Sequence, residues 1–233
     1  MTQFDKRNLS MMMDFYEMTM SYGYFHQPNR DVRVAFDLFF RSVPDKGGYA
    51  IFAGLQHVIE FVENLSFSDA DIAYFRKQNL FSEEFLDFLR GFRFRGDIYA
   101  MPEGTIIYPN EPLLTIVAPI IDAQLVETAI LAQINHQSLV ATKASRIVRA
   151  AEGRKVADFG ARRAHNMDAA TYGARAAYIG GIDMTATVSA GQQFNIPISG
   201  TMAHSWVMFF KDEYTAFKQY AEIYPQATVL LVD

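Results

Sequence analysis

Three short apolar runs in the second half of the chain each carry or precede residues that can do chemistry. The runs are 156–159, which leads into Gly160, Arg162, Arg163 and His165; 182–188, which contains Asp183; and 198–202, which contains Thr201 and leads into His204 and Ser205. Apolar runs that end in glycine, arginine or histidine and precede a helical pattern are typical of the catalytic rim of a βα barrel. We therefore expect the functional site at the carboxyl ends of these three predicted strands.

Arg162 and Arg163 supply two guanidinium groups shortly after Phe159 and Gly160. A guanidinium binds a carboxylate or a phosphate through two parallel hydrogen bonds, so this pair favours an anionic ligand. The alternative interpretation is an ordinary solvated pair of charges in a loop. Asp183 would be costly to bury alone, so it is either a carboxylate of the site or the partner of a nearby arginine.

His204 closely follows a glycine and lies near the hydroxyl groups of Thr201 and Ser205. A histidine can act as a base, a metal ligand or a nucleophile, and the residues around His204 do not choose among these roles. The nearest acid downstream is Asp212 and the nearest histidine upstream is His165, so no local metal motif is centred on His204. The sequence therefore predicts no metal ligands in the protein.

The first half of the chain predicts an α+β unit. Periodicity and turn residues predict a helix at 11–25, a strand at 32–40, a turn at 44–48, a helix at 49–64, and helices that begin at Ser68 and Ser82, the second ending at Gly91. Short strands at 95–100, 105–107 and 113–117 predict an antiparallel unit with Arg93, Arg95 and Glu103 as surface charges. One long helix is expected from Asp122 to Gly153.

From residue 155 onward, strand patterns and helix patterns alternate. The predicted strands are 155–159, 182–188, 198–202 and 228–232, and the predicted helices are 166–179, 189–194 and 212–223. This alternation is typical of a parallel βα array. Four such strands without closing partners would leave open edges, so we expect the chain to self-associate or to be unstable alone.

Composition excludes several other classes of protein. The chain has 233 residues, half of them apolar, which allows a large core. Its net charge of −5 argues against a nucleic-acid partner, because proteins that bind the phosphate backbone normally carry a basic surplus. It has no cysteine for a disulfide or a thiolate zinc site. Its apolar runs are shorter than the roughly 20 residues that span a bilayer. Since no signal-peptide pattern opens the sequence, we expect a cytoplasmic protein without a membrane partner.

Four motifs, in order along the chain, resemble those of the nicotinate phosphoribosyltransferase family. They are DFYEMTM at 14–20, FGARRAH at 159–165, AAYIGG at 176–181 and SGTMAHS at 199–205. The sequence departs from the family at Asn166-Met167, where many relatives have a glycine. The resemblance implies a sandwich-like N-terminal α/β domain over residues 1–130, followed over residues 131–233 by the first part of an irregular α/β barrel of the type II phosphoribosyltransferase kind.

The resemblance also implies an enzyme of NAD biosynthesis. Such an enzyme condenses nicotinate with phosphoribosyl pyrophosphate, assisted by ATP, to give nicotinate mononucleotide and pyrophosphate. Tyr16 would then stack on the pyridine ring, Arg162 and Arg163 would hold anionic groups, and His204 would be the histidine that ATP phosphorylates. The expected substrate-binding set is completed by Asp183, Thr201 and Ser205. Mg²⁺ would arrive with ATP and pyrophosphate.

Members of this family continue for roughly as many residues again, so the resemblance implies that this chain corresponds to their N-terminal half. We then expect a homo-oligomer or a chain that requires the C-terminal half. Two alternatives stay open. One is a nicotinamide or quinolinate phosphoribosyltransferase, and the other is a non-catalytic half-barrel that works only as a subunit or remnant.

Overall fold

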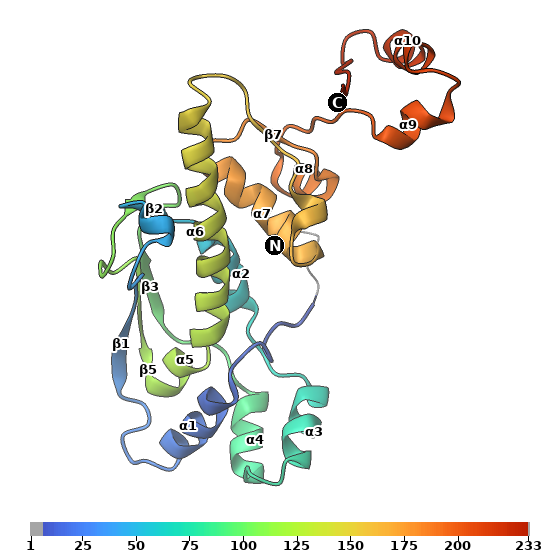
Figure 1. The fold of residues 1–233 in the computed structure, drawn as a ribbon. Helices are drawn as coiled ribbons and strands as arrows, with labels where there is room; N and C mark the ends of the chain where they lie inside the picture. The colour runs from blue at the N-terminus through green and yellow to red at the C-terminus, as the bar shows by residue number, and fades with distance from the viewer. Residues whose placement is uncertain (1–6, 233) are drawn as a thin grey trace.

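The front part of the molecule is built on a small antiparallel sheet. The computed structural model describes residues 7–232 (Figure 1). Its three-stranded sheet has the order β1-β5-β3, with β1 at Arg33–Leu38, β5 at Leu114–Pro119 and β3 at Asp97–Ala100. Leu38 pairs with Leu114, and Asp97 pairs with Val117. A second antiparallel pair joins β2 (Ala50–Ile51) to β4 (Ile106–Ile107). The predicted antiparallel unit is thus confirmed.

Four helices complete this front part: α1 (Phe15–Phe25), α2 (Leu55–Asn64), α3 (Asp69–Lys77) and α4 (Glu83–Arg90). Ser68 begins α3 with the predicted capping box. The Asp71 amide donates to Ser68 Oγ at 3.3 Å, and the Ser68 amide donates to Asp71 Oδ2 at 2.8 Å. Ser82 caps α4 by accepting a hydrogen bond from the Phe85 amide. The predicted starts of both helices are confirmed, because a cap is a local interaction.

The predicted helix at 49–64 is wrong in its first part. Ala50 and Ile51 pair in a sheet, and α2 begins only after Gly54, whose φ of 108° is left-handed. A Cβ atom at position 54 would lie 2.8 Å from the carbonyl oxygen of Gln133. Glycine is therefore required where the chain passes so close to the neighbouring helix.

Residues 120–150 form two helices, α5 (Ile120–Gln124) and α6 (Glu127–Ala150), where the sequence predicts one. Val126, which precedes α6, provides no side-chain cap. Glu17 of α1 takes this role, because its Oε1 accepts a hydrogen bond from the Thr128 amide at 3.0 Å. A carboxylate from a distant part of the chain therefore stabilises the start of α6.

Glu17 is fully buried, and its Oε2 has no hydrogen-bond partner within the described residues. Burial raises the pKa of this carboxyl, and the hydrogen bonds from Thr128 oppose the rise only in part. The folded protein therefore holds this proton more tightly than the unfolded chain does. The free energy of unfolding should accordingly fall as the pH rises above the ordinary range of a glutamate carboxyl.

Replacing Glu17 by glutamine keeps an acceptor for the Thr128 amide and removes the titration. We expect the stability of this variant relative to the native chain to increase between about pH 4 and about pH 8. Urea unfolding at several pH values measures the difference. Glu84→Gln, at an exposed position of α4, is the control for replacing a glutamate by glutamine. A stability difference for Glu17→Gln that stays constant with pH would contradict this interpretation.

Two residues expected to be surface charges make internal contacts. Asp122 is fully buried and accepts hydrogen bonds from the Arg95 amide at 2.9 Å and from the Arg95 guanidinium at 3.0 and 3.1 Å. Glu103 is mostly buried and pairs with Arg175. The prediction is therefore wrong for Glu103, whose partner comes from an element that local sequence does not reveal. Arg95 does lie at the surface, with its side chain 53% exposed.

The main hydrophobic core lies in the front part. Its largest fully buried side chains are Phe52, Phe85, Met18, Leu65, Ile72, Leu86, Leu89, Ile107, Leu113, Leu114, Leu125 and Ile134. Burying one such side chain contributes about 1.5–3 kcal/mol. The part after α6 adds only small clusters, such as the one formed by Ala144, Ala177 and Ile182. Most of the hydrophobic stabilisation therefore comes from the front part.

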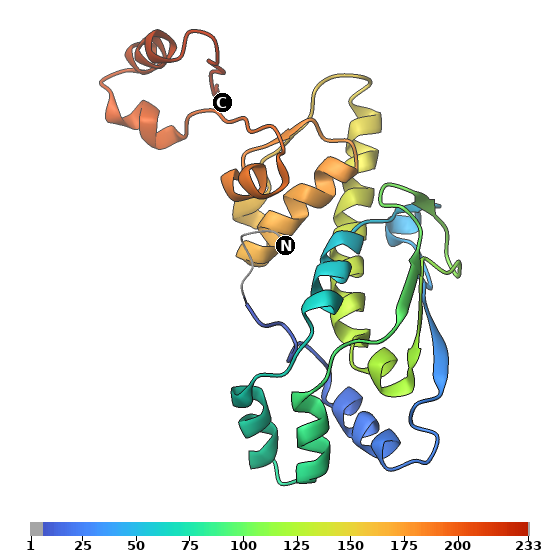
Figure 2. The same ribbon diagram turned by 180° about the vertical axis from the view of Figure 1, so that it is seen from behind.

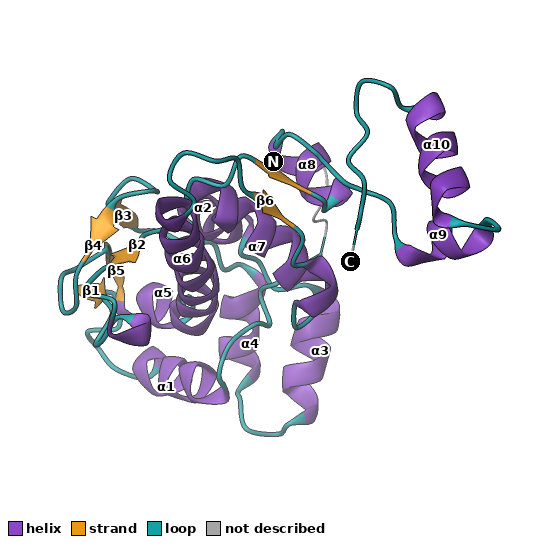
Figure 3. Ribbon diagram, turned by 45° about the horizontal axis from the view of Figure 1, so that its top comes forward, coloured by secondary structure: helices purple, strands orange, loops and turns teal. Residues whose placement is uncertain are grey.

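The βα array lies on the other side of α6 from the front sheet (Figure 3). β6 (Ala157–Asp158) runs parallel to β7 (Met184–Thr185), and Thr185 makes a single parallel bridge to Ile198. The helices α7 (Met167–Ile179) and α8 (Val188–Phe194) follow these strands. The predicted parallel βα order is confirmed, although the strands are shorter than expected. The proposed domain boundary after residue 130 stays a prediction, and α6 runs across it.

The last two helices project from the body of the molecule (Figures 1 and 2). α10 (Glu213–Ile223) was predicted, whereas α9 (His204–Phe209) was not. Trp206 Nε1 donates to the Ala216 carbonyl oxygen at 3.0 Å and joins the two helices. The predicted strand at 228–232 is wrong, because in the described part of the chain these residues pair with no other strand. None of the described helices is long and apolar enough to cross a membrane.

We expect the isolated chain to self-associate. Met208 and Phe209 of α9 are 80% and 81% exposed, and Tyr214 and Val232 are also largely exposed. Apolar side chains gathered on one projecting segment favour association with another apolar surface. Analytical ultracentrifugation should show species larger than the 26.4 kDa monomer. A monodisperse monomer that unfolds cooperatively would contradict this expectation.

Candidate functional site

Arg162 and Arg163 lie in a short 3₁₀ turn, Ala161–Arg163, that directly follows β6 and Gly160. Both side chains are exposed. Within residues 7–232, neither guanidinium makes a hydrogen bond or an ion pair. The turn therefore presents two positive charges at the carboxyl end of a parallel strand, where they are available to an anion.

The aspartate at the end of β6 does not neutralise these arginines. Asp158 Oδ1 accepts a hydrogen bond from the Gly160 amide at 2.9 Å, and Asp158 Oδ2 accepts one from Thr185 Oγ1 at 2.8 Å. Thr185 is almost completely buried, and its Oγ1 also accepts from the Thr187 amide at 3.0 Å. The carboxyl ends of β6 and β7 are thus held together by side chains as well as by the backbone ladder.

Asp183 lies at the opposite edge of this sheet, before β7 begins. Its Oδ2 accepts a hydrogen bond from the Val156 amide at 2.8 Å, and its own amide donates to the Val156 carbonyl oxygen at 3.0 Å. Asp183 is exposed. It therefore joins the amino ends of β6 and β7. The sequence left open a role in the site or a nearby arginine as partner, and the partner in the structure is the backbone of Val156.

His204 and Ser205 begin α9, whose preceding residue Ala203 makes no side-chain cap. Thr201 Oγ1 donates to the Met202 carbonyl oxygen at 3.1 Å, so this hydroxyl is engaged locally. His204 and Ser205 are exposed. Because α9 projects from the body, the structure does not bring His204 together with the turn Ala161–Arg163, which we call the arginine turn (Figures 1 and 2).

Tyr16 lies on α1, at the other end of the molecule from α9 (Figures 1 and 2). Its hydroxyl donates to Glu127 Oε1 at 2.9 Å, and Gln124 Nε2 donates to Glu127 Oε2 at 2.7 Å. Partial burial and the hydrogen bond to Glu127 raise the pKa of the Tyr16 phenol to about 12. Tyr16 is 42% exposed, so part of its side chain is accessible to a ligand.

A buried polar cluster between the front part and α7 was not predicted. Arg175 of α7 binds Glu103 through two hydrogen bonds, Nη1 to Oε1 at 2.9 Å and Nη2 to Oε2 at 2.6 Å. Arg175 also donates to Gln56 Oε1 at 2.8 Å and to Gln137 Oε1 at 3.3 Å. Glu103 Oε1 accepts from the amides of Gly54 and Leu55, so it caps α2. Four elements therefore meet at one ion pair.

The cluster has consequences for two titratable groups. Burial alone would raise the pKa of Glu103, but Arg175 and the two amides hold the pKa of this carboxyl below its usual value. Burial, and then the positive charge of Arg175, lower the pKa of the His57 imidazole, which lies next to Gln137. In the sequence, the one feature that indicated this buried polar cluster is the unusual number of polar residues in the middle of α6, among them Gln137.

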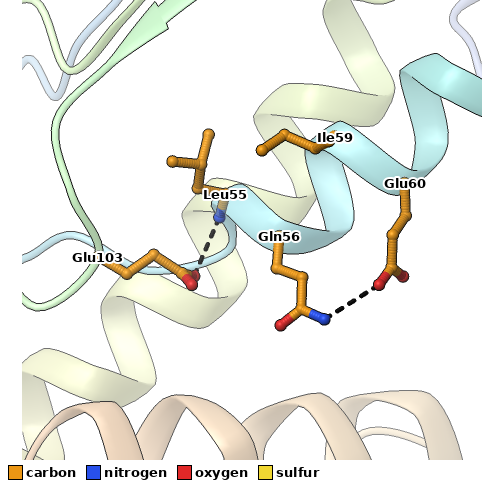
Figure 4. A pocket seen from close by; sticks show the side chains of 5 residues that line it. All are labelled: Leu55, Gln56, Ile59, Glu60 and Glu103. Carbon is orange, nitrogen blue, oxygen red and sulfur yellow. Dashed lines mark hydrogen bonds between the residues drawn. The ribbon is translucent and has the colours of Figure 1, made fainter. Parts of the chain in front are cut away.

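Two cavities lie away from the arginine turn. One, of about 390 Å³, is lined by Leu55, Gln56, Ile59, Glu60 and Glu103 beside the cluster (Figure 4). In Figure 4 Glu103 accepts from the Leu55 amide and Gln56 donates to Glu60. The other, of about 460 Å³, lies between β1, β5 and α6 and includes Glu127. Among the described residues no group of three or more His, Asp or Glu side chains is placed to hold a metal ion.

Comparison with known proteins identifies the family. Residues 11–135 match the nicotinate phosphoribosyltransferase N-terminal domain, and residues 154–229 match the nicotinate phosphoribosyltransferase family. The chain is 49% identical over 96% of its length to nicotinate phosphoribosyltransferase pncB2 of Mycobacterium tuberculosis and 46% identical over 99% to the Bacillus subtilis nicotinate phosphoribosyltransferase. It spans 48% and 47% of these two proteins, which is about half their length.

Solved structures agree with this result. The crystal structure of human nicotinic acid phosphoribosyltransferase superposes with a TM-score of 0.79 at 33% identity, covering 85% of this chain and 40% of the human chain. A nicotinate-nucleotide pyrophosphorylase from Pyrococcus furiosus gives the same TM-score at 27% identity, covering 100% of this chain and 54% of the other. The fold is therefore an α/β fold with a partial barrel of the phosphoribosyltransferase kind. Since the N-terminal domain match alone covers more than half of the 233 residues, the chain belongs to the nicotinate phosphoribosyltransferase family.

Proposed function

We propose that this chain supplies the base-binding and histidine elements of an enzyme that makes nicotinate mononucleotide. The reaction joins nicotinate to phosphoribosyl pyrophosphate and releases pyrophosphate, and ATP hydrolysis assists it. The observation that carries the proposal is the turn at the carboxyl end of β6, whose two guanidiniums have no partner in the part of the chain that the structure describes. Nicotinate, phosphoribosyl pyrophosphate and pyrophosphate are all anions, which is what such a turn suits. Family membership supports the same chemistry.

The arginine turn should bind anions through planar, paired hydrogen bonds. Replacing Arg162 or Arg163 by lysine keeps the charge and loses this geometry. A charge-assisted hydrogen bond is worth about 1.5–3 kcal/mol, so each variant should weaken the binding of inorganic pyrophosphate roughly tenfold or more. Isothermal titration calorimetry measures the change.

Arg149→Lys provides the matched control, because Arg149 is an exposed arginine of α6 outside the turn. This variant should bind pyrophosphate as the native chain does. Unchanged affinity in both turn variants would return Arg162 and Arg163 to the role of solvated surface charges.

ATP would transfer a phosphoryl group to His204, and this phosphohistidine would couple hydrolysis to the condensation. The exposed imidazole at the start of α9 is accessible to a nucleotide. Mg²⁺ would come to the site with the phosphates of ATP and pyrophosphate, since no carboxylate cage is found within residues 7–232. Thr201 and Ser205 flank this histidine, and Ser205 adds a hydroxyl donor for the phosphates.

A complete site requires more than one copy of this chain or a C-terminal half. Tyr16 lies on α1 and His204 on α9, and these two helices lie at opposite ends of the molecule, so one chain does not bring both residues to one substrate in this conformation (Figure 1). A homo-oligomer, or a partner that corresponds to the rest of the relatives' length, would supply the second set of groups. In either case Tyr16 stacks on the pyridine ring, with its hydroxyl held by Glu127.

The test is the formation of nicotinate mononucleotide from nicotinate, phosphoribosyl pyrophosphate and ATP. The chain is assayed alone and together with the C-terminal half of a relative such as the Bacillus subtilis protein. Product in either assay supports the proposal, and product only in the second shows that the C-terminal half is needed. Absence of product in both would favour a non-catalytic half-barrel.

A further inference from the structure

The two oxygens of the Asp158 carboxylate bind one group on a loop and one on the neighbouring strand. Oδ1 accepts from the Gly160 amide at 2.9 Å, on the loop after β6, and Oδ2 accepts from Thr185 Oγ1 at 2.8 Å, on β7. The carbonyl oxygen of Gly160 in turn accepts from the Arg163 amide at 2.9 Å. Gly160 is therefore bound on both sides, by Asp158 before it and by the arginine turn after it.

Thr185 connects this arrangement to the rest of the sheet. Its side chain is almost completely buried, its amide donates to the Pro197 carbonyl oxygen, and its carbonyl oxygen accepts from the Ser199 amide, both at 3.0 Å. Its hydroxyl donates to Asp158 and accepts from the Thr187 amide. A buried hydroxyl that uses both its donor and its acceptor is fixed in direction, so it can hold Asp158 in one orientation.

We propose that Asp158 and Thr185 are positioning residues that set the direction of Arg162 and Arg163 toward an anionic substrate. This inference rests on the proposed anion-binding role of the turn. Asp158 has its two oxygens occupied by the Gly160 amide and the Thr185 hydroxyl, so it orders the turn without pairing with either guanidinium. The charges of the turn then remain available while its backbone is held in place.

A matched pair of substitutions tests the proposal on this chain. Thr185→Val has nearly the same shape and removes the hydroxyl, whereas Thr185→Ser keeps it. We expect hydrogen exchange of the Gly160 and Thr187 amides, followed by NMR, to become at least roughly tenfold faster in Thr185→Val and to stay near native rates in Thr185→Ser. Asp158→Ala should speed exchange at Gly160 in the same way.

The Ala186 amide is the internal control. It donates to the backbone carbonyl oxygen of Asp158 at 2.8 Å, a ladder bond that does not involve either side chain. Its exchange should not change in Thr185→Val if the side chains position only the loops. Equal acceleration at Ala186 and Gly160 would show a general loosening of the sheet and would overturn the proposal, as would an unchanged rate at Gly160.

Pyrophosphate affinity separates this inference from the proposed function. In Thr185→Val the affinity should fall roughly threefold to tenfold, the equivalent of one lost hydrogen bond, and Thr185→Ser should restore it. If the native chain binds no pyrophosphate, the anion-binding role of the turn fails, while the exchange rates still decide whether Asp158 and Thr185 order it. If native binding occurs and Thr185→Val leaves it unchanged, the positioning role is overturned and the proposed function stands.

Discussion

Replacing Arg175 by methionine is expected to lower the free energy of unfolding by about 3–5 kcal/mol, because it leaves the Glu103 carboxylate buried without a charged partner. The Arg175 and Glu103 side chains are only 10% and 19% exposed, and they share two hydrogen bonds. Methionine keeps much of the bulk of the arginine stem but lacks the guanidinium, whose Cζ lies 5.6 Å from the centroid of the Phe194 ring. The loss of unfolding free energy should therefore come mainly from the charge and the hydrogen bonds of the Arg175 guanidinium. Chemical denaturation followed by circular dichroism measures it.

Two further variants make the Arg175 prediction specific. Arg76 pairs with Glu83 through two hydrogen bonds of 2.7 Å on the surface, so Arg76→Met removes an ion pair of similar geometry in solvent and should cost far less. Glu103→Gln combined with Arg175→Met removes the unpaired charge and keeps an oxygen for the Gly54 and Leu55 amides. This double variant should recover a large part of the loss. If Arg175→Met loses no more unfolding free energy than Arg76→Met, the buried cluster does not stabilise the fold as we expect.

The starts of helices could be predicted from the sequence because their caps are local. Ser68 and Ser82 begin α3 and α4 as expected. In the βα array, Asn166 accepts from the Ala169 amide and Asp212 accepts from the Thr215 amide at the predicted starts of α7 and α10. Each of these bonds joins residues three positions apart, so the sequence contains all of the information needed.

Interactions between distant residues could not be predicted. The break between α5 and α6 is capped by Glu17, and Glu103 is drawn inside by Arg175, which comes later in the chain. Arg175 lies in an alanine-rich helix, where a single arginine looks like a surface residue. A strand likewise depends on its neighbours, and residues 228–232 have β-prone composition but no partner strand in the described part of the chain.

The sequence predicted where the two arginines of the candidate site lie, but it predicted the arrangement of the other site residues only in part. The two arginines follow β6 as expected, because a strand followed by a glycine marks a loop at the carboxyl end. The spacing of Asp158 from Thr185 could not reveal that their side chains meet across two parallel strands. The sequence also did not reveal that Asp183 binds the Val156 backbone at the amino ends of β6 and β7.

Phosphorylation by γ-labelled ATP is expected to mark His204, and replacing His204 by asparagine should abolish the label completely. Among the histidines, His57 is buried and His136 is half-buried with its Nε2 next to the Ala169 carbonyl oxygen at 3.3 Å. These two are poorly placed to receive a phosphoryl group. His165 is exposed in the loop after the arginine turn and is the nearest rival to His204.

The His204 experiment is done on the chain with a supplied C-terminal half of a relative, because the chain spans about half the length of the curated relatives. Acid-labile, alkali-stable label identifies a phosphohistidine. His165→Asn is the matched control, since His165 is also exposed and this variant should keep the label. Both positions are exposed, so neither change should alter the thermal midpoint by more than about 2 °C. Label that persists in His204→Asn would remove His204 from the acceptor role, and label lost only in His165→Asn would assign that role to His165, which follows the two arginines proposed to bind anions.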